Sequence, residues 1–362
     1  MLKESKTIVV KIGSSLLVDE FSGRLRMDFI YHLMNDIAFY HNQGHKMVLV
    51  SSGSVALGRR YSGIPSGTDL TLAQKQASAA LGQPVLMAAY QNFAAEHDLR
   101  TAQILITLHD FEDRKRFLNA EDTLEELLSQ GTIPIVNEND TVATKHLRVG
   151  DNDRLSAKVA QLVEADELVI LTDVDGLWDR DKNIVEKIET LNESIFDLAG
   201  GATGPGTGGM VTKLLAAEIA SASGCTTHIT TGHGELPIRN AIEDLTLHTT
   251  IQSGTTPENA RHLWIATSLD IQGSVEISPE TVTSLQSVRS ILPADIIDAV
   301  GTFGRGDIIS ITSGKNEFAR GIVAFNHHEV QALIQNRKPD IFSVLGYNTR
   351  PDIVHKNDIA IL

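Results

Sequence analysis

The chain has 362 residues, of which 42% are hydrophobic and 21% charged, a balance typical of a soluble globular protein with one large or two smaller domains. Its formal net charge of −15 argues against a general binder of nucleic acids or of anionic membranes. The sequence contains no apolar run that approaches the roughly 20 residues needed to span a bilayer.

The N-terminus and the cysteine content favour a reducing compartment. The first five residues are short and polar and lead directly into an apolar run, which is not the pattern of a signal peptide. Cys225 is the single cysteine, so an intrachain disulfide is excluded. We therefore expect a cytoplasmic protein.

The first two thirds of the chain alternates short apolar strands with helical segments. Strands are predicted over residues 7–12, 47–50, 103–107, 133–136, 168–171 and 226–230. Helices are predicted near 30–38, 117–130 and 154–164, with two more over 71–97 that are separated near Gly82-Gln83-Pro84. This alternation, which runs to about residue 265, predicts an α/β fold with a mostly parallel sheet sandwiched by helices.

Polar clusters follow four of the predicted strands at the point where each strand ends. They comprise residues 13–15, 51–54, 137–140 and 172–173. Ligands of parallel sheets bind at the carboxyl ends of the strands. The sequence therefore predicts one binding site at this edge of the sheet.

The organisation changes near residue 270. Short strands are predicted over 273–277, 308–312 and 318–325, with glycine-rich turns between them and a helical piece over 329–334. We predict three parts: a larger α/β domain over 1–266, a linker over 267–272, and a small, mainly β domain over 273–362.

A glycine-rich loop over Gly204–Lys213 precedes one of the helical patterns. It has four glycines in six residues, and Lys213 falls in the first turn of the helix that follows. Exposed N–H groups at a helix N-terminus favour anions, so the loop is a candidate phosphate site, with a flexible surface loop as the alternative. The dinucleotide fingerprint is rejected because no strand directly precedes the loop. The P-loop is rejected because Gly209 is not followed by lysine.

Lys11 is a second cation of interest, because it lies near the end of an apolar strand, where lysine is uncommon. It could point to water from an edge strand, or it could face the same anion as Lys213. In the second case the two lysines would repel each other, and a carboxylate from Asp151-Asn152-Asp153 could hold both. The alternative for this triplet is a helix N-cap.

These motifs together resemble the amino acid kinase family, and most closely its glutamate-phosphorylating members. The resemblance rests on Val9–Ser15, Val50–Gly53, Asn137–Asp140, Val149–Asp153, Leu171–Asp173 and Gly206–Lys213. The tail resembles a PUA domain through Leu292-Pro293, Val300–Asp307, Ala319–Gly321 and Leu345–Tyr347. Nearly the whole chain is covered.

The resemblance implies an amino acid kinase fold followed by a PUA domain, and an activity. The expected reaction is the ATP- and Mg²⁺-dependent phosphorylation of the L-glutamate side-chain carboxylate, the first step of proline biosynthesis. The alternatives are a sibling kinase that acts on acetylglutamate or aspartate, or an RNA-binding accessory that works through the tail.

The resemblance also implies roles for individual residues. The catalytic residues would be Lys11, Lys213 and Asp153. Glutamate would be bound by Ser51, Gly53, Asn137, Asp140 and Asn152, with Asp140 and Asn137 as candidate acceptors for its ammonium group. The nucleotide would contact Lys11, Gly13, Thr172, Asp173, Thr207, Gly208, Gly209, Met210, Val211, Thr212 and Lys213. Gly13 and Gly53 would present backbone N–H groups, and no side chain is assigned to Mg²⁺.

The implied partners are small molecules and other copies of the chain. They include proline as a feedback inhibitor, for which the polar loop over 61–71 is the nominated responsive element, and the next enzyme of the pathway. From residue 270 onward eleven acidic residues stand against eight basic ones, a net charge of about −3. Because a phosphate backbone attracts the opposite sign, a regulatory or assembly role is favoured for the tail over RNA binding.

Overall fold

The computed structural model describes residues 5–65, 68–142, 151–200, 209–285, 289–314, 316–336 and 341–362. The chain divides into two compact units, Met1–Pro257 and Glu258–Leu362. The boundary between these units falls inside the predicted 1–266 domain. The predicted division into a first domain, a linker and a second domain therefore remains a prediction. Each unit is described by itself.

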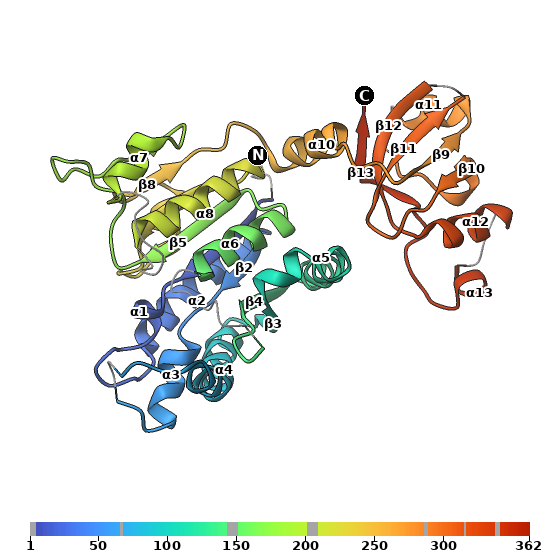
Figure 1. Cartoon of the computed structure of the whole chain (residues 1–362). Helices are drawn as coiled ribbons and strands as arrows, with labels where there is room; N and C mark the ends of the chain where they lie inside the picture. The colour runs from blue at the N-terminus through green and yellow to red at the C-terminus, as the bar shows by residue number, and fades with distance from the viewer. Residues whose placement is uncertain are drawn as a thin grey trace. The chain divides into compact units, whose positions relative to one another are not determined.

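The first unit is built on an eight-stranded sheet (Figure 1). Its strands are β1 (Thr7–Ile12), β2 (Lys46–Val50), β3 (Arg100–Ile106), β4 (Thr132–Glu138), β5 (Glu167–Thr172), β6 (Lys187–Ile188), β7 (Thr226–Thr231) and β8 (Thr249–Ile251). Their order is β3-β4-β2-β1-β5-β7-β8-β6, and only the β7–β8 pair is antiparallel. The predicted mostly parallel sheet is confirmed.

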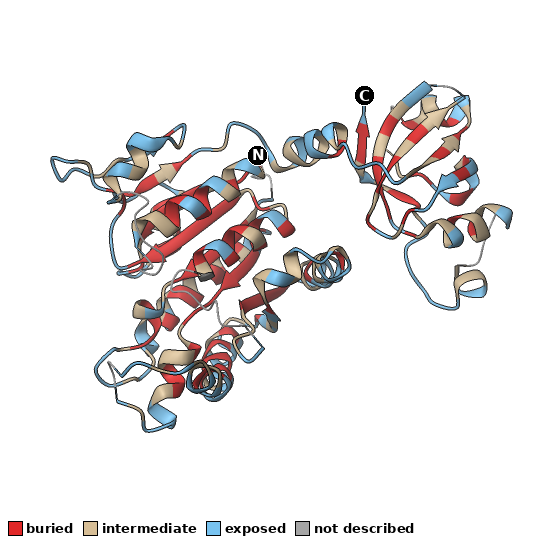
Figure 2. Ribbon diagram, viewed as in Figure 1, coloured by how far each residue is buried: buried red, intermediate tan, exposed pale blue. Residues whose placement is uncertain are grey.

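Helices cover both faces of this sheet. They are α1 (Ser14–Leu17), α2 (Met27–Asn42), α3 (Ser54–Tyr61), α4 (Leu72–Ala95), α5 (Arg114–Ser129), α6 (Asp151–Leu162), α7 (Glu193–Leu198), α8 (Met210–Ala222) and α9 (Pro237–Ile242), with a 3₁₀ turn over Leu108–Phe111. Residues of α2, α4 and α9 form one apolar core with the sheet, whereas residues of α5, α6 and α8 form another on the opposite face. The central strands β1, β2 and β5 are therefore buried along most of their length (Figure 2).

Alternation along β1 decides which residues meet which layer. Ile8, Val10 and Ile12 pack in the core with α2 and α4, while Val9 packs in the core with α6 and α8. Because side chains of a strand alternate between faces, Lys11 lies on the same face as Val9. The lysine is thus directed toward the layer that contains α6 and α8.

The prediction of two helices over 71–97 is wrong, because α4 is one continuous helix of 24 residues. A Cβ added to Gly82 would lie 1.9 Å from the carbonyl oxygen of Ser54, so the glycine is required for the close approach of α3 and α4. Pro84 lies on the exposed side of the helix. Helix-breaking residues are thus tolerated here because close tertiary packing stabilises the helical conformation.

The second unit has a five-stranded sheet of order β10-β9-β11-β12-β13. Its elements are α10 (Pro257–Thr267), β9 (Gly273–Ile277), α11 (Pro279–Leu285), β10 (Ile296–Gly301), β11 (Ile308–Ser313), β12 (Asn316–Val323), α12 (His327–Gln335), α13 (Ile341–Leu345) and β13 (Val354–Ile361), with a 3₁₀ turn over Pro293–Asp295. Only the β9–β11 pair is parallel. The unit has an apolar core of its own.

Helix α10 packs with the second unit. Its Ile265 joins a small buried cluster with Ile308 and Ile322. Arg320 of β12 also donates hydrogen bonds to the carbonyl oxygens of Ala266 (2.7 Å) and Ser268 (2.8 Å). The segment before β9 is therefore attached to this unit, and it is not a free tether.

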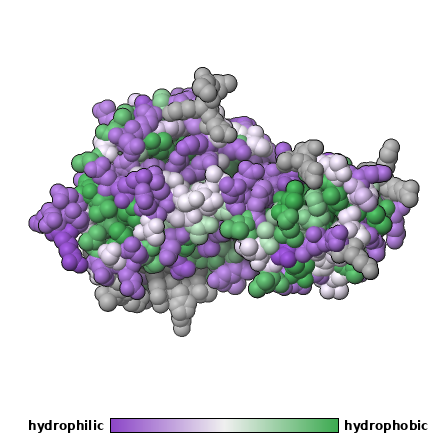
Figure 3. All heavy atoms as spheres, turned by 90° about the horizontal axis from the view of Figure 1, so that it is seen from above, coloured by the Kyte–Doolittle hydropathy of each residue, from purple (hydrophilic) through white to green (hydrophobic). Residues whose placement is uncertain are grey.

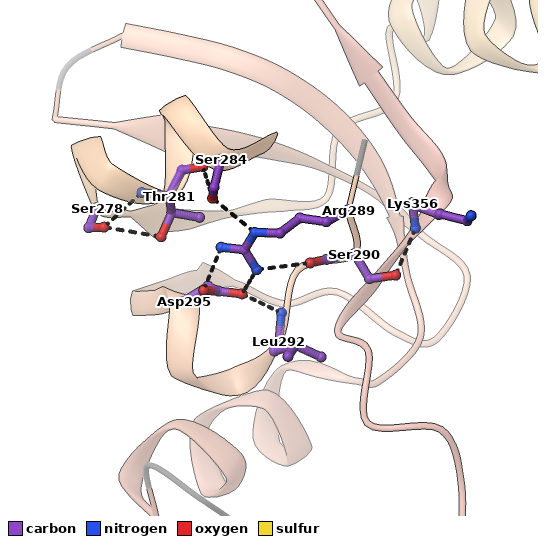
Figure 4. A network of polar contacts seen from close by, with 8 residues as sticks. All are labelled: Ser278, Thr281, Ser284, Arg289, Ser290, Leu292, Asp295 and Lys356. Atoms are coloured by element: carbon purple, nitrogen blue, oxygen red, sulfur yellow. Dashed lines mark hydrogen bonds and ion pairs between the residues drawn. The ribbon is translucent and has the colours of Figure 1, made fainter. Parts of the chain in front are cut away.

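A network around Arg289 closes the corner between α11 and β10 (Figure 4). The guanidinium donates to both carboxylate oxygens of Asp295 (2.7 and 2.8 Å) and to the hydroxyl of Ser284 (2.9 Å). Partial burial alone would raise the pKa of Asp295, but the hydrogen bonds from Arg289 and from the Leu292 N–H hold it below its usual value. All of these partners belong to the second unit, so the network is a structural clamp within it.

Hydrophobic patches on the surface are interrupted by hydrophilic residues on the face shown in Figure 3. Within the described ranges, none of the helices combines the length and the apolar character that a membrane crossing requires.

Asp36 connects two helices, α2 and α9, that lie on the same face of the sheet. It is fully buried and its Oδ2 accepts the backbone N–H groups of Ile238 (2.7 Å) and Arg239 (2.9 Å), which begin α9. The Arg239 Nε lies 3.5 Å from the other carboxylate oxygen. A side chain of α2 thus satisfies the N–H groups that every helix leaves unpaired at its start.

We expect Asp36→Ala to lower the free energy of unfolding by about 2 kcal/mol, because two backbone N–H groups lose their acceptor and the Arg239 guanidinium loses its ion-pair partner. Urea unfolding followed by circular dichroism measures the change. Asp28→Ala removes an exposed carboxylate from the same helix and is the matched control. Equal unfolding midpoints for the two variants would contradict this role.

Candidate active site

The carboxyl ends of β1, β2, β4 and β5 meet at one edge of the sheet and border a cavity of about 920 Å³. Nine of the predicted residues line it: Lys11, Gly13, Gly53, Asp140, Asn152, Asp153, Thr172, Asp173 and Lys213. These residues come from six separate stretches of sequence. The fold therefore brings together the residues that the sequence pattern predicted to lie at one edge of the sheet.

One buried carboxylate joins two buried lysines in this cavity. The Nζ of Lys11 lies 2.6 Å from Oδ1 of Asp153, and the Nζ of Lys213 lies 3.5 Å from Oδ2. The lysines come from β1 and α8 and the aspartate from the first turn of α6. The side chain of Asp153 is only 2% exposed, and those of Lys11 and Lys213 are 8% and 6% exposed.

The charges of this triad are strongly interdependent. Burial alone would raise the pKa of Asp153, but the two lysines hold it below its usual value of 3.8. Burial lowers the pKa of Lys213 from 10.5, and Lys11 lowers it further, against the opposing effect of Asp153. Two ammonium groups share one carboxylate, so the triad has an excess positive charge that suits an anionic ligand.

The start of α8 supports the carboxylate. The hydroxyl of Thr212 donates to Oδ2 of Asp153 (2.7 Å) and lies within hydrogen-bond distance of the carbonyl oxygen of Gly209 (2.9 Å). Gly209, Met210 and Val211 lie at or next to the helix N-terminus and are at least partly exposed, outside the cavity lining. The predicted nucleotide contacts Thr207 and Gly208 lie outside the described residues.

The prediction that Gly13 offers its own N–H group to a phosphate is wrong. This N–H is donated to the carbonyl oxygen of Leu171 (3.1 Å), which ties the end of β1 to β5. Gly53 has a φ of +90°, in the left-handed region that favours glycine, and this conformation turns the chain from β2 into α3. Both glycines line the cavity.

A second group of polar residues lies on the side of the cavity that belongs to β2 and β4. Nδ2 of Asn152 donates to the carbonyl oxygen of Ser51 (3.0 Å) and to the hydroxyl of Ser52 (2.8 Å), and lies 3.3 Å from Oδ1 of Asn137. Asp140 accepts a hydrogen bond from the hydroxyl of Ser54 (3.1 Å). This side therefore presents acceptor oxygens, whereas the triad presents cations.

Ser51 and Asn137 do not reach the cavity directly. They are almost completely buried and do not belong to its lining, whereas Asn152 and Asp140 do. Ser51 and Asn137 hold Asn152 from behind, so their predicted direct contact with a substrate stays a prediction.

The predicted nucleotide pair Thr172-Asp173 follows β5 and lines the cavity near Lys213. The Thr172 hydroxyl donates to Oδ1 of Asp173 (3.0 Å). The negative charge of Asp173 is among those that favour the protonated form of Lys213. No three His, Cys, Asp or Glu side chains among the described residues gather closely enough to form a metal cage.

Several residues of the site were not predicted from the sequence. Ser52, Ser54 and Glu138 belong to the predicted polar clusters, so their position after a strand was a usable signal. Arg59 and Arg60 lie on α3, which was not predicted at all.

The chain matches a profile of the amino acid kinase family over residues 6–231. It is 43% identical to the glutamate 5-kinase of Roseobacter denitrificans, an alignment that covers 99% of this chain and 98% of that protein. The chain belongs to the amino acid kinase family.

Other members of the amino acid kinase family show the same relationship. The glutamate 5-kinase of Paramagnetospirillum magneticum is 40% identical over 99% of both chains. Among solved structures, a Giardia carbamate kinase matches with a TM-score of 0.50 at 19% identity, over 69% of this chain and all of that one. That likeness concerns the fold alone, and it agrees with the predicted amino acid kinase fold.

The lowered pKa of Asp153 makes its contribution to stability dependent on pH. A carboxyl whose pKa is lower in the folded state stabilises the fold above its unfolded pKa, and this contribution is lost as the pH falls through the folded value. We expect Asp153→Asn to cost about 3 kcal/mol at pH 7, with a smaller difference from the unaltered chain below pH 3.8. Urea unfolding of both proteins between pH 7 and pH 3 measures this, and a pH-independent difference would contradict it.

Proposed function

We propose that this chain transfers the γ-phosphoryl group of ATP to the side-chain carboxylate of L-glutamate, which gives L-glutamyl 5-phosphate and ADP. The observation that carries the proposal is the buried Lys11–Asp153–Lys213 triad, which lines a cavity together with Asp140 and Asn152. The relatives that match over nearly their whole length are glutamate 5-kinases. This reaction begins proline biosynthesis.

The chemistry needs cations more than it needs a base. A carboxylate oxygen is already a nucleophile; it forms a bond to the γ-phosphorus while the bond from phosphorus to the β,γ-bridging oxygen breaks, and ADP leaves with that electron pair. The protein must hold two anions in line and neutralise the charge that spreads over the transferring group. In this scheme Lys11 contacts the transferring phosphoryl group, Lys213 stabilises the leaving side, and Asp153 orients both lysines.

The part of the cavity near the ends of β2 and β4 suits the ammonium group of an amino acid. Asp140 supplies a carboxylate there. Among the described residues, Asn152 forms side-chain hydrogen bonds through Nδ2, which leaves its Oδ1 as an acceptor. An N-acylated substrate such as acetylglutamate has no ammonium group for these acceptors, which disfavours the sibling kinase that acts on it.

The nucleotide and its Mg²⁺ would lie near β5 and the start of α8. We propose that Thr172 and Asp173 contact the nucleotide, together with the residues from Thr207 to Lys213. Bound Mg²⁺ would supply charge neutralisation between the phosphates, and Asp173 is one of the carboxylates that line the cavity.

Regulation and the role of the tail also belong to the proposal. Proline resembles a cyclised glutamate, so we propose that it competes for the Asp140 side of the cavity as a feedback inhibitor.

The mixed five-stranded sheet of the second unit supports the PUA assignment. The acidic balance of this segment supports a regulatory or assembly role over RNA binding.

A hydroxamate assay tests the activity. With ATP, Mg²⁺ and hydroxylamine, we expect the hydroxamate of glutamate to form, and little or none with aspartate or acetylglutamate. Lys11→Ala and Lys213→Ala should each lower kcat at least about a hundred-fold, because each removes a cation from the transferring charge. Far-UV circular dichroism should stay native.

Lys46→Ala is the matched control, because it removes an exposed lysine from β2. Turnover of this variant should equal that of the unaltered chain. Absence of hydroxamate from glutamate with the unaltered chain would overturn the proposed function, and near-normal turnover of either triad variant would overturn the role of that lysine.

The ammonium contact predicts a selective effect on one substrate. Asp140→Ala should raise the glutamate KM about ten-fold or more and leave the ATP KM within about two-fold, because only glutamate loses a charged partner. Steady-state kinetics with each substrate varied in turn measure both constants. Glu218→Ala removes an exposed carboxylate from α8 and serves as the control. A comparable rise in both KM values would argue against the contact.

A further inference from the structure

One face of helix α4 contacts the residues that support the glutamate side of the cavity. Gln83 faces Asn137 at the end of β4, and Tyr90 faces Ser51 at the end of β2. These two α4 residues are seven positions, or about two turns, apart, so they lie on the same side of the helix. Both are buried, Gln83 with 8% exposure and Tyr90 with 0%.

We infer that Gln83 and Tyr90 are positioning residues for glutamate binding, which act through Asn137 and Ser51 on the cavity-lining Asn152. This inference rests on the proposed function, and it assigns to α4 a role in substrate affinity.

The hydrogen bonds around Asn137 determine which way its amide points. Oδ1 of Asn137 accepts the backbone N–H of Glu138 (2.9 Å) and lies 3.3 Å from Nδ2 of Asn152. A carbonyl oxygen must occupy this place, because both neighbours are donors. Nδ2 of Asn137 therefore points to Gln83, and it donates to Oε1 at 2.8 Å.

Gln83 thereby fixes the orientation on which Asn152 depends. If the Asn137 amide turned over, its Nδ2 would face the amide nitrogen of Asn152 and two donors would oppose each other. The acceptor offered by Gln83 prevents that rotation. With Nδ2 of Asn152 held by the protein, its Oδ1 stays available to a substrate ammonium group.

Tyr90 acts in the same direction on the neighbouring strand. The Ser51 hydroxyl lies 3.3 Å from the carbonyl oxygen of Ser52 and 3.0 Å from the Tyr90 hydroxyl. If Ser51 donates to Ser52, it accepts from Tyr90. The backbone carbonyl of Ser51 is one of the acceptors that hold Asn152, so Tyr90 helps to fix this acceptor in place.

The amide nitrogen of Gln83 argues against a purely structural role for this side chain. Its Nε2 is buried and has no hydrogen-bond partner within the described part of the chain. A buried donor without a partner is unfavourable, so an apolar side chain of similar volume would serve packing alone better than glutamine does. The role of the acceptor Oε1 accounts for glutamine at this position.

Close helix packing makes α4 a rigid support. A Cβ on Gly82 would lie 1.9 Å from the Ser54 carbonyl oxygen, and a Cβ on Gly58 would lie 1.7 Å from the Ser78 carbonyl oxygen. The backbones of α3 and α4 are therefore in direct contact at Ser78 and Gly82, which lie one turn apart on α4. Ser54, whose hydroxyl donates to Asp140, is the first residue of α3. The same packing therefore connects α4 to Asp140, the second predicted ammonium partner.

The experiment compares Gln83→Met and Tyr90→Phe with the unaltered chain. Each substitution removes the polar contact and keeps most of the side-chain volume. We expect the glutamate KM to rise about ten-fold with Gln83→Met, the equivalent of one lost hydrogen bond, and several-fold with Tyr90→Phe. The ATP KM should stay within about two-fold, since the triad is untouched, and kcat at saturating glutamate should change less than the glutamate KM.

Matched controls exist on the same layer of helices. Gln91→Met alters an exposed glutamine of α4, and Tyr31→Phe alters a partly exposed tyrosine of α2. Both should leave the two KM values unchanged. A double-mutant cycle tests the route of the effect: when Asn137 is already alanine, Gln83→Met should raise the glutamate KM no further.

The outcomes separate this inference from the proposed function. If the unaltered chain phosphorylates no glutamate, the proposed function itself fails. If the unaltered chain is active but neither variant raises the glutamate KM selectively, the positioning role of α4 is overturned. Additive effects of Gln83→Met and Asn137→Ala would overturn the route through Asn137. If Gln83→Met does not fold, Tyr90→Phe decides the inference by the same selective rise.

Discussion

The shared carboxylate of Asp153 is the interaction on which the site depends. Two lysines cannot stay protonated side by side in a buried cavity unless an anion offsets their repulsion and their loss of hydration. Asp153 meets both within salt-bridge distance, and Thr212 donates a further hydrogen bond to it. The triad joins β1, α6 and α8, so the packing of these three elements and the charge of the site are established together.

The cavity is electrically asymmetric, and this asymmetry suits a two-substrate reaction. The chain carries a net charge of −15, yet the triad concentrates cations where two anions must meet. Near the ends of β2 and β4 the cavity offers Asp140 and Asn152 as acceptors. A protein with this overall charge would repel both ATP and glutamate at long range, so local cations in the cavity are needed to bind them.

The contacts behind the cavity form a second layer with a different character. Ser51, Asn137 and Gln83 are neutral and buried. Hydrogen bonds connect Gln83 to Asn137, and Asn152 to both Asn137 and Ser51. Neutral side chains fix the orientation of a neighbouring group through hydrogen bonds without adding charge. This suits residues that orient a binding group beside a cavity that already contains several charged side chains. The second unit, by contrast, uses its Arg289–Asp295 ion pair to close a corner of its own fold.

The sequence by itself determined the strand–helix alternation, the edge where the polar clusters gather, and the residue types of the triad. Local periodicity and the positions of glycine and apolar residues depend on neighbours in the chain, so these features can be read without coordinates. The motif resemblance identified the family for the same reason, since the motifs are short and contiguous. Long-range packing was not accessible in this way.

Only the tertiary structure decided that α4 passes through Gly82 and Pro84 without a break, that the Gly13 N–H is used by β5, and that Ser51 and Asn137 lie behind the cavity. It also decided that Gln83 reaches Asn137, although 54 positions separate them in the sequence. Each of these facts depends on which residues meet across the fold. They are determined by the free energies of close packing and of buried hydrogen bonds between distant residues. A local sequence pattern carries no information about these contacts.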